Sequence, residues 1–150
     1  TSDHALLRPD WVRQLIDQAP AGSDLAVMLA RRELVEAALP GSKRTWLRFA
    51  DGHWSGCNLF LLASPKAHVA LDLWSGIEAD RKRPWRIVRR LGSGALLAYA
   101  LGRLSLAEGL ARLGQRHGMA VALVPAAAGL AAVDVDKPQD LIDVRRLIEG

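Results

Sequence analysis

Hydrophobic and polar residues alternate along the chain with two different periods. Behind Pro9 the apolar positions recur every three to four residues, which predicts a helix with proline in its first turn. Two buried strands are predicted at residues 24–30, where an apolar run follows Asp24, and at residues 119–124, which are all apolar. Further helices are predicted from helical spacing at residues 31–39, 64–77, 84–91, 95–101, 105–118 and 138–148.

Two local signals sharpen this pattern. Asp51-Gly52 lies between the alternating run 43–49 and the strand-like run 53–62, an arrangement typical of a hairpin. Ser105 followed three residues later by Glu108 is the spacing of a capping box, which predicts a helix start. Helices alternating with buried strands, together with one hairpin, predict a three-layer α/β domain with a mixed sheet.

Composition narrows the functional classes only slightly. The 150 residues, half of them hydrophobic, are about the size of one domain, so residues 1–150 are predicted to form a single domain. A net charge of +4 is compatible with an anionic partner and identifies none. The single cysteine, Cys57, excludes an intrachain disulfide and a cysteine-built zinc site, which suits a cytoplasmic location. No uncharged apolar run is long enough to span a membrane.

The segment from Val133 to Leu141 contains the first candidate chemistry. Asp134 and Asp136 end an apolar run, and in an extended strand residues two apart point to the same side. Two converging carboxylates are the oxygen ligands that Mg²⁺ takes in proteins. The alternative is that Asp136 only caps the helix that Pro138 begins. The motif alone favours the cap.

Four other polar residues stand at places where ligands often bind. Asp3 lies in a predicted loop just before a helix, although it is equally compatible with a solvated acid near the chain end. Asn58 lies between Gly56 and an apolar strand, so it is either a β-bulge residue or a substrate contact. Lys82 and Arg83 belong to a basic run that is either a solvated face or a phosphate contact.

Three segments in this order, residues 2–7, 56–61 and 133–141, resemble the MobA-like NTP transferases, a nucleotidyltransferase family. The resemblance implies a Rossmann-like (GT-A-like) fold. Ala5 stands where the family usually has proline, and the family's Gly-rich nucleotide loop would lie upstream of Thr1. Since the chain also starts without methionine, we expect it to be the C-terminal portion of such a domain, lacking the N-terminal nucleotide-binding strands.

The resemblance also implies roles for the candidate residues. Asp3, Asp134 and Asp136 would bind Mg²⁺ as the cofactor, with Asp3 the acid of an Asp-x-Pro-like motif. Asn58 would line the acceptor side of the site. A role for Lys82 in catalysis or phosphate binding is suggested only by a similar basic segment in some family members, with Arg83 beside it.

The expected reaction transfers a nucleoside monophosphate from a nucleoside triphosphate to a phosphorylated or hydroxyl small-molecule acceptor, and pyrophosphate leaves. We expect this activity from a full-length parent and none from the chain alone. The alternative is a non-catalytic basic module that binds nucleic acid or another anionic ligand through residues 81–90, where Trp85 is the one aromatic residue. Homodimerisation through an exposed sheet edge is a further expectation. The sequence identifies neither the acceptor nor the base.

Overall fold

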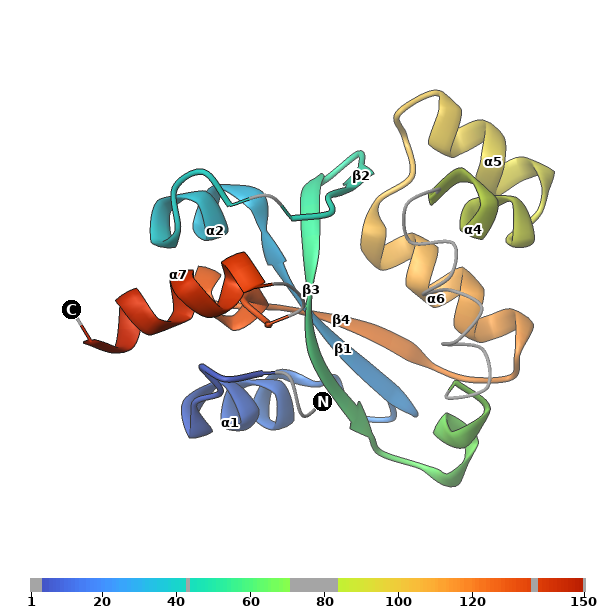
Figure 1. Ribbon diagram of the computed structural model, residues 1–150. Coiled ribbons are helices and arrows are strands. Elements are labelled where there is room, and N and C mark those ends of the chain that lie inside the picture. Colours follow the sequence, from blue (N-terminus) through green and yellow to red (C-terminus); the bar gives the residue numbers. More distant parts are fainter. Residues whose placement is uncertain (1–3, 43, 71–83, 136–137, 150) are drawn as a thin grey trace.

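A mixed four-stranded sheet forms the centre of the protein. The structure, a computed structural model, describes residues 4–42, 44–70, 84–135 and 138–149 (Figure 1). The strands are β1 (Leu25–Arg31), β2 (Leu47–Phe49), β3 (Gly52–Leu62) and β4 (Val121–Pro125), in the order β2-β3-β1-β4. β1 pairs antiparallel with β3 and parallel with β4, which confirms the predicted mixed sheet.

Helices cover both faces of the curled sheet. In Figure 1, α1 (Pro9–Gln18), α2 (Arg32–Ala38) and α7 (Pro138–Glu149) lie on one side. On the other side lie α4 (Pro84–Arg90), α5 (Ser93–Ala100) and α6 (Leu106–Arg116). Two 3₁₀ helices, η1 (Pro65–Ala67) and η2 (Gly129–Ala132), follow β3 and β4. No helix in the described ranges is both long and apolar enough to cross a membrane.

Strand β1 divides the core into two layers because successive side chains point to opposite faces of a sheet. Ala26, Met28 and Ala30 pack with α1, α2 and η2, whereas Leu25, Val27 and Leu29 pack with Trp54 and the start of α6. The first six residues of β1 are buried, as expected of a strand covered on both faces.

Local signals placed the element boundaries well. Pro9 begins α1, and the predicted hairpin is present, with Ala50 and Asp51 as the turn residues and Gly52 as the first residue of β3. At α6 the Ser105 hydroxyl accepts from the Glu108 backbone N–H at 3.2 Å, and the Glu108 carboxylate accepts from the Ser105 N–H at 3.1 Å. The capping box is therefore confirmed. Of the helix predicted at 64–77, the structure shows η1 and residues 68–70, and the remainder lies outside the described residues.

The segment that leads to Asp134 does not form an extended strand. Residues 129–132 form η2, and residues 133–135 are in no strand. The cause is close packing on α2. A Cβ placed on Gly129 would lie 2.0 Å from the Leu34 carbonyl oxygen, and Ala131 and Ala132 are fully buried. Small side chains therefore allow a tight turn beneath α2, and Asp134 emerges from that turn rather than from a strand.

A candidate site around Asn58 and Asp134

Asn58 lies at an irregularity in β3. Leu59 is opposite Met28, but the next pair joins Gly56 to Leu29, so the register shifts at this point. Asn58 has a φ of 53°, a left-handed conformation that asparagine tolerates better than most residues. The β-bulge interpretation of Asn58 is therefore confirmed. Bulges redirect side chains, and they are frequent beside functional sites.

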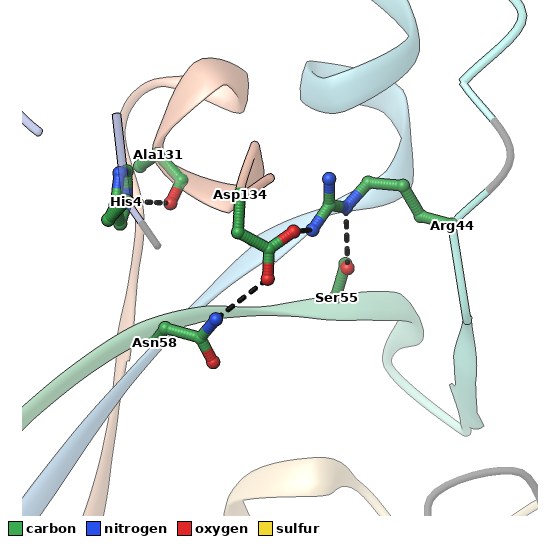
Figure 2. Close-up of polar contacts among 6 residues, drawn as sticks. All are labelled: His4, Arg44, Ser55, Asn58, Ala131 and Asp134. Carbon is green, nitrogen blue, oxygen red and sulfur yellow. Dashed lines mark hydrogen bonds and ion pairs between the residues drawn. The ribbon is translucent and has the colours of Figure 1, made fainter. Parts of the chain in front are cut away.

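The bulge brings Asn58 to Asp134, although 76 residues separate the two in sequence. The Asn58 side-chain N–H₂ donates to Oδ2 of Asp134 at 2.7 Å (Figure 2). The pairing of Leu59 with Met28 places this contact toward the carboxyl end of β1, and β4 runs parallel to β1. Ligands of α/β proteins bind most often at the carboxyl ends of parallel strands. Two of the predicted site residues thus form one polar cluster.

Arg44 completes this cluster, and sequence reasoning missed it. Its Nη2 donates to Oδ1 of Asp134 in an ion pair, and its Nε donates to the Ser55 hydroxyl at 3.3 Å (Figure 2). The side chains of Arg44 and Asp134 are only 13% and 14% exposed. Arg44 precedes β2 in a run of alternating basic and apolar residues, where it is indistinguishable from an ordinary solvent-facing strand position.

Two buried residues lie close to the cluster. Burial raises the pKa of the Cys57 thiol to about 12; Arg44 acts against this rise and Asp134 adds to it. Cys57 is therefore an uncharged thiol at neutral pH and a poor nucleophile. His4 donates from Nε2 to the Ala131 carbonyl at 2.8 Å and packs 5.7 Å from the Trp11 ring, measured between ring centroids. His4 thus ties the start of the described chain to η2.

The other predicted site residues, Asp3, Lys82, Arg83 and Asp136, lie outside the described residues. The structure therefore places one of the three expected Mg²⁺ ligands, Asp134, and both oxygens of that carboxylate already accept hydrogen bonds. No group of three His, Cys, Asp or Glu side chains gathers within the described ranges. A magnesium ion prefers several oxygen ligands and no adjacent guanidinium, so the described residues alone do not form a magnesium site.

Comparison with solved structures shows one clear likeness. The chain is similar to a hypothetical transferase from Thermus thermophilus, with a TM-score of 0.75 and 38% sequence identity. The likeness covers 94% of this chain and 61% of that protein, so the chain spans about three fifths of the length of the structure it matches. No family model and no curated protein matches the chain.

Proposed function

We propose that the protein acts as a nucleotidyltransferase, moving a nucleoside monophosphate from a triphosphate to a small phosphorylated or hydroxyl acceptor. The observation that carries the proposal is the contact between Asn58 and Asp134, which the MobA-like resemblance had assigned to one site. The likeness to a protein described as a hypothetical transferase supports the broader class. The finer assignment to the GT-A-like fold of that family is part of the same proposal.

The described residues are compatible with a reaction whose rate depends mainly on how the two substrates are oriented. Such a transfer needs the acceptor oxygen in line with the α-phosphorus, and correct orientation alone lowers the barrier substantially. The Asn58 amide, held on a bulge of β3, would orient that acceptor. When bound, Mg²⁺ would neutralise phosphate charge. The proposed dependence on Mg²⁺ rests on the resemblance and on Asp3 and Asp136.

Pyrophosphate release by the natural protein that carries this chain tests the proposal. Each common nucleoside triphosphate is supplied with a panel of sugar and alcohol phosphates, with and without MgCl₂. We expect release with at least one pair of substrates, and a fall of about 100-fold for Asn58→Ala because the acceptor loses its orientation. Arg13→Gln, which removes an exposed ion pair with Asp10 on α1, is the matched control. Pyrophosphate release unaffected by Asn58→Ala would contradict the assignment of the site.

A second candidate function, binding of single-stranded nucleic acid, rests on a different surface. Trp85 on α4 is 45% exposed, and the guanidinium groups of Arg86 and Arg89 lie 5.6 and 5.4 Å from its ring centroid. An exposed aromatic ring can stack on a base, and the arginines beside it can neutralise the neighbouring phosphate. Affinity for an oligonucleotide should then fall steeply between about 50 and 200 mM salt. Negligible binding at the lower salt concentration would remove this candidate.

A further inference from the structure

We propose that Arg44 is a positioning residue for this reaction: through Asp134 it sets the orientation of the Asn58 side-chain amide. The inference about the reaction rests on the proposed function, whereas the coupling between the three side chains can be tested separately. Arg44, Asn58 and Asp134 come from the segment before β2, from β3 and from the segment before α7. Nothing in the resemblance or the sequence pattern pointed to Arg44.

The carboxylate of Asp134 connects the other two side chains. One of its oxygens accepts from Arg44 and the other accepts from Asn58 (Figure 2). Arg44 is itself held at two points, because its Nε donates to Ser55 on β3 while its Nη2 donates to Asp134. A planar guanidinium bound at two nitrogens cannot rotate freely. The carboxylate plane is therefore fixed by a group that is anchored on the same strand as Asn58.

The fixed carboxylate favours one orientation of the Asn58 amide. Its N–H₂ group donates to Asp134, so the carbonyl oxygen points away from the carboxylate (Figure 2). The reversed amide would set an oxygen against a carboxylate oxygen, which both repels and loses the hydrogen bond. Loss of Arg44 would leave Asp134 charged and mostly buried without its cation. The carboxylate would then move toward water, and the constraint that Asp134 places on Asn58 would be lost.

A double-mutant cycle on turnover tests the catalytic half of the proposal. Arg44→Gln should lower kcat about 10- to 100-fold and change KM little, because the acceptor still binds but is poorly aligned. If Arg44 acts through Asn58, adding Arg44→Gln to Asn58→Ala should cost no further activity. Arg44→Lys keeps the charge and should recover part of kcat, and it also serves if the Gln variant folds poorly. Additive losses would overturn the role of Arg44 as a positioning residue.

Side-chain amide resonances of Asn58 test the coupling without any substrate. Asn58→Ala identifies the pair of N–H₂ peaks in a ¹⁵N spectrum of the chain. We expect Arg44→Gln to shift both peaks, Arg44→Lys to shift them less, and Arg13→Gln on α1 to leave them in place. Unmoved peaks in Arg44→Gln, with the backbone spectrum intact, would overturn the coupling. If the wild-type protein transfers no nucleotide but these peaks shift, the proposed function fails while the coupling is upheld.

Discussion

Two aspartates bind polar partners at opposite ends of the sheet, and they do so by different means. Asp24, just before β1, accepts from the Ser64 hydroxyl at 2.5 Å and from the Ala120 backbone N–H at 2.8 Å. Asp134, toward the carboxyl ends of β1 and β4, accepts from a guanidinium and from a side-chain amide. The first carboxylate has neutral donors, and the second has a cation from a distant segment.

The difference separates a structural residue from a candidate functional one. Asp24 joins the ends of three strands that already meet through backbone hydrogen bonds, including Asp24 N–H to Ala120 O at 2.8 Å and Ala63 N–H to Asp24 O at 2.9 Å. Asp134 belongs to no strand, and from a mostly buried position it ties its own segment to β3 and to the residues just before β2. A mostly buried ion pair has a desolvation cost when it forms, and removing one partner leaves an uncompensated charge.

The largest effect should come from removing the cation of the Asp134 cluster. Arg44→Gln leaves a buried carboxylate without its charged partner, and we expect the free energy of unfolding to fall by about 3 kcal/mol. For a chain of this size that lowers Tm by about 10 °C. Urea unfolding followed by circular dichroism measures the loss. Arg13→Gln, whose ion pair is more than two-thirds exposed, should cost less than about 1 kcal/mol. Equal losses of unfolding free energy in Arg44→Gln and Arg13→Gln would contradict a special role for the buried ion pair.

A somewhat smaller effect should follow from crowding the turn that leads to Asp134. In Gly129→Ala the new Cβ would lie 2.0 Å from the Leu34 carbonyl oxygen and 2.7 Å from the Val35 nitrogen. Backbone atoms cannot move aside as a flexible side chain can, so η2 must shift, at a cost of about 2 kcal/mol. Gly94→Ala on α5 meets no atom within 4 Å, and we expect it to be neutral or slightly stabilising. Urea unfolding compares the two variants.

At the Asp24 end of the sheet, replacing the carboxylate should have a smaller effect on stability, visible in how stability changes at acidic pH. The Ser64 hydroxyl and then the Ala120 N–H hold the pKa of Asp24 below its ordinary value. Its contribution to stability is therefore complete above the ordinary carboxyl range and is lost as pH falls below about 4. Asp24→Asn keeps the shape without the titration, so its Tm should fall less steeply than wild type between about pH 4 and 2. Parallel Tm curves would show that this carboxylate contributes nothing to acid sensitivity.

Residues with local signals were predictable, and residues with distant partners were not. Pro9 and the Ser105–Glu108 box act within a few positions of themselves, and the structure confirms both. Arg44 is 90 residues from Asp134, and no periodicity reports such a contact. The turn that leads to Asp134 could not be predicted for the same reason, because its shape depends on how closely η2 packs beneath α2. Asn58 is intermediate between these cases: Gly56, two residues before it, indicated the bulge, but no local signal in the sequence indicated its partner Asp134.

The smallest effect, and the most local, concerns the thiol next to Asn58. Because burial raises the pKa of Cys57 to about 12, the folded protein should resist iodoacetamide at pH 8 and react only when β3 opens. The rate of alkylation therefore measures opening at the Asp134 end of the sheet. We expect Arg44→Gln to raise that rate and Asp24→Asn to leave it near the wild-type value, since Asp24 stabilises the opposite end. An equal rise in both variants would mean that the sheet opens as one unit. The two aspartates would then have different partners but would stabilise the same opening unit.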